Sequence, residues 1–200
     1  LANHKEADFG LSGEVDRMER YVEQALFYAR SSAVSKDYLV GPVNLQKIVQ
    51  QTILSYRRQL REINARIDLH DLEQEVYSDG KWVQFMLGQV IGNSIKYAPE
   101  KDAEGCGLIL EIYATNTANA IQLHVKDNGV GIRASEVDRV FDKGFTGHNG
   151  RSGAKSTGIG LYLCKKLLIY MFVIVFSLLD LFLVPCDLGL QEFLSLRAYR

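Results

Sequence analysis

The sequence lacks an excess of charge of either sign. Its 23 Lys and Arg residues nearly balance its 24 Asp and Glu residues, which leaves a formal net charge of -1. Without a basic surplus there is no electrostatic indication of nucleic-acid binding, and we expect no nucleic-acid partner. With 47% apolar and 24% charged residues, the composition is that of a globular domain. It excludes a disordered or collagen-like chain.

Cysteine is also scarce. The three cysteines, Cys106, Cys164 and Cys186, are too few and too far apart for a disulfide framework or a zinc cluster. An odd number in a chain of 200 residues fits a reducing compartment. The chain begins with Leu1 and shows no signal-peptide pattern, so we expect it to be part of a longer protein.

The chain divides into a short helical stretch, a longer mixed stretch and an apolar tail. In residues 12–35, apolar side chains recur every three or four positions, which predicts one amphipathic helix. Residues 37–44, with Gly41-Pro42, are expected to be a linker. Residues 45–166 mix helical and strand patterns and predict an α+β domain with a long, mobile loop before its last helix.

Within the mixed stretch, one helix is expected to begin after Asn44, which is a good N-cap, and another is expected to begin at Ser78-Asp79. The patterns typical of strands cover residues 65–69, 73–78, 108–114 and 120–126. We expect the first two strands to pair with each other and the last two to form a hairpin. Residues 133–156 contain glycine at every third position from Gly144 to Gly153, so no regular structure is expected there.

The motif Asp127-Asn128-Gly129-Val130-Gly131-Ile132 directly follows an expected strand. Glycines allow the backbone to approach a flat ligand closely, and a carboxylate accepts a hydrogen bond from an amino group such as that of adenine. Asp-Asn-Gly is also a favoured turn sequence, so by itself the motif is as well explained by a simple β-turn.

Two further motifs indicate a nucleotide. Asn93 and Lys96 share one face near the end of a helix, followed by Tyr97; an amide oxygen suits Mg²⁺ and an ammonium suits phosphate. Taken alone, they are more simply a surface residue and a helix C-terminal cation. Residues 157–161 begin a helix with Gly-x-Gly, and the free N–H groups there favour phosphate, although a helix start requires no ligand.

Taken together and in this order, the motifs resemble the ATP-binding domain shared by sensor histidine kinases, gyrase-type topoisomerases, Hsp90 and MutL. Residues 93–97 resemble the N box, residues 127–132 the G1 box and residues 157–161 the G2 box. Phe141 begins a segment similar to the F box of the ATP lid. The lid sequence and the helix at residues 12–35 are similar to sensor histidine kinases of the Gram-positive type that responds to envelope stress and peptide antibiotics.

The resemblance implies a two-layer α/β sandwich preceded by one helix of a dimerisation and phosphoacceptor hairpin. It implies a protein histidine kinase that uses ATP and Mg²⁺, forms a homodimer through the hairpin and passes phosphate to a response regulator. The parent protein would be in the cell membrane, with this portion on the cytoplasmic side. The implied ATP-binding residues are Asn93, which would also hold the metal, and Lys96, Tyr97, Asp127, Gly129, Gly131, Ile132, Phe141, Thr157, Gly158, Gly160 and Leu161.

The sequence departs from the family at the phosphoacceptor histidine, so the catalytic histidine itself is not assigned. His4 lacks the family context and is interpreted as a solvated residue, whereas His70, His124 and His148 fall inside the ATP-binding stretch. The alternative function is therefore a non-catalytic or degenerate ATP-binding or dimerisation module.

The tail, residues 167–200, departs more strongly, because residues 167–183 are almost continuously apolar. They are open to three interpretations: a membrane helix after Lys165-Lys166, a buried element of an altered core, or off-pattern sequence. We favour off-pattern sequence, because Asp180 would cost about 2.5–3.5 kcal/mol near the centre of a membrane helix. A sheet without the family's final strand pair would also expose an unpaired edge.

Overall fold

The computed structural model describes residues 39–100, 105, 107–117, 120–148 and 157–178, with the backbone alone for 172–178, and the isolated residues Met18, Val22 and Ala25. The chain divides into two compact units, Leu1–Asp37 and Tyr38–Arg200. In the first unit the three described residues are helical and exposed, at the spacing of one helix face. The rest of the helix expected at residues 12–35 lies outside the described residues.

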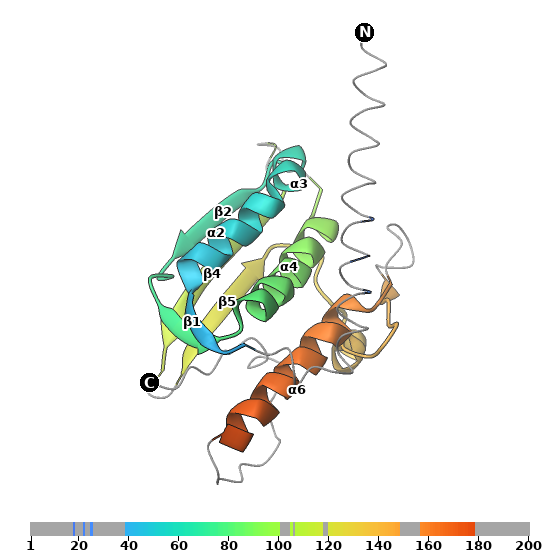
Figure 1. Ribbon diagram of the computed structural model, residues 1–200. Coiled ribbons are helices and arrows are strands. Elements are labelled where there is room, and N and C mark those ends of the chain that lie inside the picture. Colours follow the sequence, from blue (N-terminus) through green and yellow to red (C-terminus); the bar gives the residue numbers. More distant parts are fainter. Residues whose placement is uncertain are drawn as a thin grey trace. The chain divides into compact units, whose positions relative to one another are not determined.

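The second unit contains two sheets (Figure 1). The larger is a mixed sheet in which β4 (Ile109–Asn116) lies between β2 (Arg66–His70), which is parallel to it, and β5 (Ile121–Asp127), which is antiparallel. The smaller is an antiparallel pair of β1 (Gly41–Asn44) and β3 (Glu75–Ser78). The predicted hairpin of β4 and β5 is confirmed.

The helices of this unit are α2 (Leu45–Ser55), α3 (Arg57–Glu62), α4 (Gly80–Lys96), the 3₁₀ helix η2 (Ala134–Arg139) and α6 (Gly160–Leu178). Both predicted helix starts are confirmed, with Asn44 and Asp79 as the N-caps. The Asn44 side chain accepts the N–H of Lys47 at 2.8 Å, and one Asp79 oxygen accepts the N–H groups of Lys81 and Trp82. These side chains satisfy N–H groups that have no carbonyl partner within their own helix.

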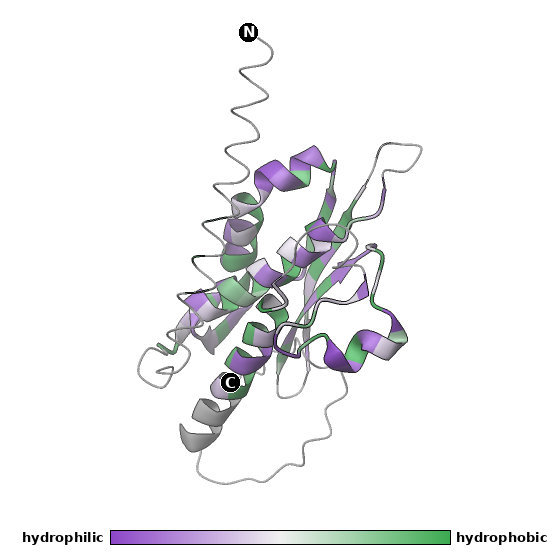
Figure 2. Ribbon diagram, turned by 90° about the vertical axis from the view of Figure 1, so that its right-hand side faces the viewer, coloured by the Kyte–Doolittle hydropathy of each residue, from purple (hydrophilic) through white to green (hydrophobic). Residues whose placement is uncertain are grey.

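The helices α2 and α4 pack against each other and cover one face of the mixed sheet (Figure 1). Figure 2 shows both hydrophilic and hydrophobic residues along these helices. A helix that packs on a sheet turns its apolar residues toward the sheet and its polar residues away from it. On β4 every second side chain points into this layer, namely Leu110, Ile112 and Ala114. Helices on one face of a mixed sheet form a two-layer α+β sandwich, and the predicted fold class is confirmed.

Two expectations about strands are wrong. Strand β3 does not pair with β2; it pairs with β1, which occupies residues 41–44 where a linker was expected. In this pairing Val43 lies opposite Val76, and both side chains are buried. Burial of both valines favours the pairing of β1 with β3. The two strands are far apart in the sequence, so local patterns do not predict this pairing.

Two further expectations concerned irregular segments. Within residues 133–156 the chain forms η2, so regular structure is present there, and residues 149–156 lie outside the described residues. The apolar run continues α6 to Leu178, and in its first part Leu167 and Met171 are buried whereas Ile169 is exposed. Residues 179–200 lie outside the described residues. Among the helices of the described part, none has the length and apolarity needed to cross a membrane.

Candidate functional site

The last turns of α4 present three residues that the sequence predicted for nucleotide binding. Asn93, Lys96 and Tyr97 are half-buried, and the backbone N–H of Tyr97 donates to the carbonyl of Asn93 at 2.9 Å to end the helix. The Lys96 ammonium lies 4.8 Å from the centre of the Tyr97 ring, a cation–π contact. Within the described part of the chain, the side-chain amide of Asn93 has no hydrogen-bond partner and is available to a ligand.

The carboxylate of Asp127, at the end of β5, has a defined orientation. One oxygen accepts the backbone N–H of Gly129 at 2.8 Å, and the other accepts the hydroxyl of Ser94 on α4, also at 2.8 Å. A carboxylate has about four acceptor positions, so each oxygen retains a further lone pair. Because Asp127 is exposed, these remaining positions are accessible to a ligand with an amino group.

The turn after Asp127 packs against the end of α4. The backbone N–H of Val130 donates to the carbonyl of Tyr97 at 3.1 Å, and a Cβ atom on Gly129 would lie 2.7 Å from that same oxygen. Gly131 has a φ of 68°, which non-glycine residues rarely adopt, and Ile132 beside it is exposed. The structure therefore brings the predicted N box and G1 box together, through backbone contacts that require glycine.

Sequence reasoning did not assign two residues that support Asp127. Ser94 lies between Asn93 and Lys96, two residues before the end of α4, and only its place in this last turn could have indicated a contact with the Asp127 turn. The side chain of Asn128 accepts the N–H of Ile109 at 2.8 Å and donates to the carbonyl of Gly107 at 3.3 Å. It thereby fixes the start of β4 beside the end of β5, a contact that only the antiparallel pairing of the strands creates.

The segment after η2 closes on the start of α6. The N–H of Gly144 donates to the carbonyl of Gly158 at 3.0 Å, which joins the two sides of the loop that the sequence predicted to be an ATP lid. Gly158 has a φ of 63°, and a Cβ atom there would lie 2.5 Å from the backbone of Gly144 and of Phe145. Phe141, half-buried, begins this segment. Glycine is required at position 158 both for its conformation and for the space.

The remaining predicted residues lie at the beginning of α6. Thr157 is exposed, Gly160 is the first residue of the helix, and Leu161 is half-buried. The helix itself packs against α4. The backbone atoms nearest to Gly158 belong to Gly144 and Phe145. The structure therefore joins the G2 box to the lid segment directly, and to the N-box helix by helix packing.

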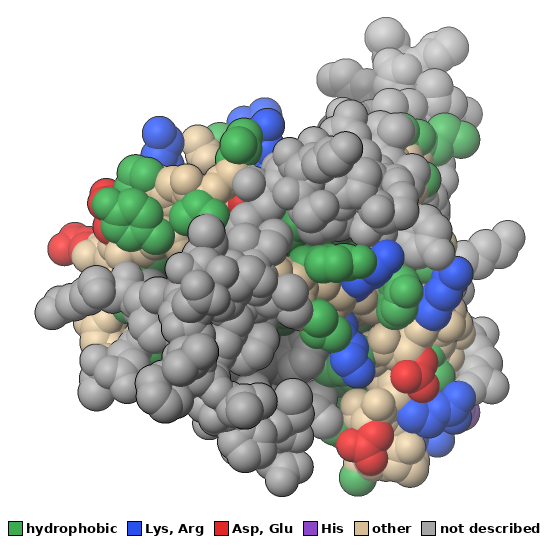
Figure 3. Space-filling model, turned by 60° about the horizontal axis from the view of Figure 1, so that its bottom comes forward, with side chains coloured by type: hydrophobic (Ala, Val, Ile, Leu, Met, Phe, Trp, Pro, Cys, Tyr) green, Lys and Arg blue, Asp and Glu red, His purple; other side chains and the backbone are tan. Residues whose placement is uncertain are grey.

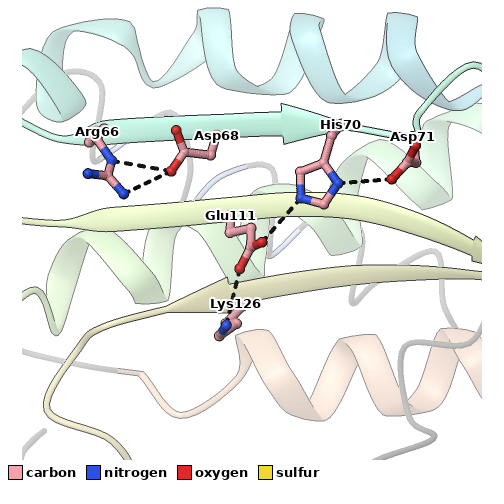
Figure 4. A network of polar contacts seen from close by, with 6 residues as sticks. All are labelled: Arg66, Asp68, His70, Asp71, Glu111 and Lys126. Atoms are coloured by element: carbon pink, nitrogen blue, oxygen red, sulfur yellow. Dashed lines mark hydrogen bonds and ion pairs between the residues drawn. The ribbon is translucent and has the colours of Figure 1, made fainter.

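The opposite face of the mixed sheet carries a separate polar network (Figure 4). His70 contacts Asp71 at 3.0 Å through one ring nitrogen and Glu111 at 3.1 Å through the other, and Lys126 donates to the second oxygen of Glu111 at 3.2 Å. The hydrogen bonds to Asp71 and Glu111 raise the pKa of His70 above 6.5. Hydrogen bonds from His70 and Lys126 lower the pKa of Glu111 below 4.5.

The charges on the surface are of both signs. In the face shown in Figure 3, described Lys, Arg, Asp and Glu side chains lie among apolar and uncharged ones, in keeping with the net charge of -1. Among the described residues, no group of three or more His, Cys, Asp or Glu side chains is placed to hold a metal ion.

Comparison with protein families agrees with this arrangement. Residues 78–173 match the family described as "Histidine kinase-, DNA gyrase B-, and HSP90-like ATPase". This domain belongs to the histidine kinase-like ATPase family. The match begins at the N-cap region of α4 and ends within the apolar run, seven residues beyond residue 166.

The curated relatives that match this chain are bacterial sensor proteins. The chain is 36% identical to sensor histidine kinase YxdK of Bacillus subtilis over 157 residues, 77% of this chain and 46% of the relative. It is 34% identical to the sensor protein BceS of the same organism over 78% of this chain and 45% of that one. The predicted resemblance to Gram-positive sensor histidine kinases is confirmed, and the chain spans a little under half the length of these relatives.

Solved structures share the fold at low identity. Full-length ShkA in complex with AMPPNP has a TM-score of 0.61 and 18% identity, covering 82% of this chain and 33% of that one. Histidine kinase ThkA in complex with response regulator protein TrrA has a TM-score of 0.56 and 18% identity, covering 80% and 42%. At this identity the likeness establishes the arrangement of the ATPase domain and not its activity.

Proposed function

We propose that this chain is the ATP-binding, catalytic part of a sensor histidine kinase, which transfers the γ-phosphoryl group of ATP to a histidine and then to a response regulator. The observation that supports this most directly is the carboxylate of Asp127, held by Ser94 and Gly129 in a turn that packs on the end of α4. A fixed, exposed acceptor beside a free amide and an ammonium suits adenine at one end and phosphate at the other.

The residues predicted from the sequence take the following roles in this proposal. Asp127 accepts a hydrogen bond from the adenine amino group, while Gly129 and Gly131 allow the backbone turn to lie beside the base. Lys96 neutralises phosphate charge and Tyr97 packs beside the nucleotide. The other positions that contact the nucleotide are Ile132, Phe141, Thr157, Gly158, Gly160 and Leu161. Catalysis is then chiefly positioning and charge neutralisation.

Asn93 is the proposed ligand of Mg²⁺. Its amide oxygen is the hard donor that Mg²⁺ prefers, and it has no competing partner within the described residues. One protein ligand is sufficient, because Mg²⁺ in nucleotide sites keeps most of its coordination to phosphates and water. The metal would neutralise charge on the phosphates, and Asn93 would keep it at the end of α4 that also carries Lys96.

The partners of the proposal extend beyond the ATPase domain. A homodimer would form through a helical hairpin that includes residues 12–35, where the described Met18, Val22 and Ala25 are helical and lie on one face. The response regulator is proposed from the named relatives and from the ThkA structure, which contains a response regulator protein. The parent protein is proposed to lie in the cell membrane, with this portion on its cytoplasmic side.

Titration calorimetry with Mg-ATP tests the binding site. We expect the chain to bind Mg-ATP and the Asp127→Ala variant to bind at least about tenfold more weakly, because a hydrogen bond to a charged group contributes about 1.5–3 kcal/mol. Asp68→Ala is the matched control, since it removes an exposed carboxylate from the opposite sheet face. No binding by the folded chain, or equal binding by the Asp127 variant, would contradict the proposal.

A phosphotransfer assay separates the kinase from the alternative, a non-catalytic ATP-binding or dimerisation module. The alternative is supported by the position of His70 and His124, which lie on sheet strands and not on a helical hairpin. A purified hairpin bearing a phosphoacceptor histidine would be supplied with labelled ATP. Transfer that is lost in Asn93→Ala supports the kinase, whereas ATP binding without transfer supports the module.

A further inference from the structure

Ser94 places a buried hydroxyl group against the carboxylate of Asp127. The residue lies on α4 with 3% of its surface exposed, and its Oγ is 2.8 Å from Asp127 Oδ2 and 3.2 Å from the carbonyl oxygen of Val90. A hydroxyl has one hydrogen to donate. The shorter bond to a charged acceptor is the stronger of the two, so the hydrogen belongs to Asp127.

The two donors to Asp127 come from different parts of the fold. Gly129 lies in the same turn and moves with Asp127, whereas Ser94 is on a helix whose neighbouring side chains are buried in the core. The turn itself is bonded to the end of α4 through the backbone of Val130 and Tyr97, but that bond does not touch the carboxylate. Among the described residues, Ser94 is the hydrogen-bond donor from α4 that contacts the Asp127 carboxylate itself, and α4 also carries Asn93 and Lys96.

We propose that Ser94 is a positioning residue that holds Asp127 in the orientation that accepts the 6-amino group of a purine, and so sets the preference for adenine over guanine nucleotides. This inference rests on the proposed ATP-binding function. A carboxylate only accepts hydrogen bonds, so it favours the amino group of adenine and repels the carbonyl oxygen at the same position of guanine. Such discrimination requires a carboxylate of fixed orientation. If the carboxylate turned away, water would hydrogen-bond to the base in its place, and water accepts from an amino group as readily as it donates to a carbonyl.

The test compares Mg-ATP and Mg-GTP binding to four forms of the full chain: wild type, Ser94→Ala, Ser94→Thr and Ser55→Ala. Alanine is the best helix former, so Ser94→Ala is expected to leave α4 intact, which thermal unfolding checks. Ser55 is the matched control, because it is a helical serine whose hydroxyl donates to a backbone carbonyl and lies exposed on α2, with no bond to a carboxylate. ATP affinity is measured by calorimetry, and GTP affinity by competition with a fluorescent ATP analogue.

We expect Ser94→Ala to weaken ATP binding by about tenfold and to leave GTP binding nearly unchanged, so that the ratio of the two affinities falls by about tenfold. Ser94→Thr keeps the hydroxyl and is expected to retain the wild-type ratio, as is Ser55→Ala. A purely structural role for Ser94 would weaken both nucleotides together and leave the ratio unchanged.

The outcomes distinguish this inference from the proposed function. If the folded wild-type chain binds no ATP, the proposed function is overturned and the role of Ser94 with it. If the wild type binds ATP but Ser94→Ala keeps the same ratio of ATP to GTP affinity, only the role of Ser94 is overturned. A ratio that falls in Ser94→Ala and is retained in Ser94→Thr supports both.

Discussion

At the scale of single residues, the glycines of the candidate site are required for different reasons. Gly129 is needed because the carbonyl of Tyr97 occupies the space of a side chain, whereas Gly131 is needed for its positive φ angle and has open space around it. Gly158 meets both restrictions. The sequence motif predicted glycines at these positions for nucleotide binding, but only the packing distinguishes a steric requirement from a conformational one.

Gly129→Ala is therefore expected to disturb the site strongly. Its Cβ would lie 2.7 Å from a backbone oxygen that cannot move without shifting the end of α4. We expect a loss of stability of about 1–3 kcal/mol, measured by urea unfolding, together with weaker Mg-ATP binding. Gly41→Ala is the control, because no atom lies within 4 Å of the added Cβ, and wild-type behaviour of Gly129→Ala would contradict the packing argument.

At the scale of elements, side-chain contacts connect β2, β4 and β5 on the face of the sheet that α2 and α4 do not cover. The rings of His70 on β2, Tyr113 on β4 and His124 on β5 stack at centroid distances of 4.9 and 4.6 Å, in register across the strands. The polar network of His70, Glu111 and Lys126 crosses the same three strands (Figure 4). The sequence does not reveal either row, because register between strands is set by tertiary packing.

This network predicts a pH-dependent contribution to the free energy of unfolding. The pKa of His70 is raised in the folded state, so its contribution is complete below its unfolded pKa near 6.5 and is lost as the pH rises through the folded pKa. The pKa of Glu111 is lowered, so its contribution is complete above its unfolded pKa near 4.5 and is lost as the pH falls through the folded pKa. The full network is expected between these two unfolded-state values.

Urea unfolding of wild type and His70→Gln over a range of pH measures this contribution. The difference in stability is expected to be largest between the two values and to shrink as the pH rises through the folded pKa of His70. His124→Gln is the control, since that ring contacts the hydroxyl of Thr115 and not a carboxylate. A His70→Gln difference that stays constant with pH would show that the ion pairs contribute nothing measurable.

Helix α6 provides a second test at this scale, because its two sides differ in burial. Leu167 is 1% exposed and Ile169 is 53% exposed, although both lie in the same apolar run. Leu167→Ala is expected to lower the free energy of unfolding by about 2–5 kcal/mol, and Ile169→Ala by less than about 0.5 kcal/mol. Thermal and urea unfolding measure both. Equal, small effects would mean that this part of the run does not belong to the core.

At the scale of the whole molecule, the core of the ATPase domain is continuous from the sheet through α2 and α4, and α6 packs against α4. Cys164 lies on the buried side of α6 with 4% of its surface exposed, and burial raises the pKa of its thiol to about 12. A buried thiol at this pKa is almost entirely protonated near neutral pH and unreactive. Reaction of the Cys164 thiol with a reagent therefore measures how far α6 has separated from the core.

A variant with Cys106→Ser and Cys186→Ser retains Cys164 as its one thiol. We expect no reaction with a thiol reagent under native conditions, and labelling in urea that follows the loss of helical circular dichroism. The reason is that the thiol becomes exposed only when α6 leaves the core. Rapid labelling without denaturant, in a variant with the wild-type unfolding midpoint, would contradict the burial of α6.

Local patterns in the sequence determined several parts of this protein. The helix starts at Asn44 and Asp79, the β4–β5 hairpin and the ordered motifs follow from capping, alternation and turn chemistry, which act between residues close in the chain. The same patterns led to the ATPase family. These predictions succeeded because each depends on a few neighbouring residues.

The tertiary structure decided the rest. It set the pairing of β3 with β1, the helical course of the apolar run, the position of Asn128 and the bond from Ser94 to Asp127. Each of these joins or buries residues that are brought together only by the packed core, and the energy of burial depends on neighbours that no local window contains. Local sequence patterns therefore identified the motifs, and the packing of the core determined how they are placed relative to one another.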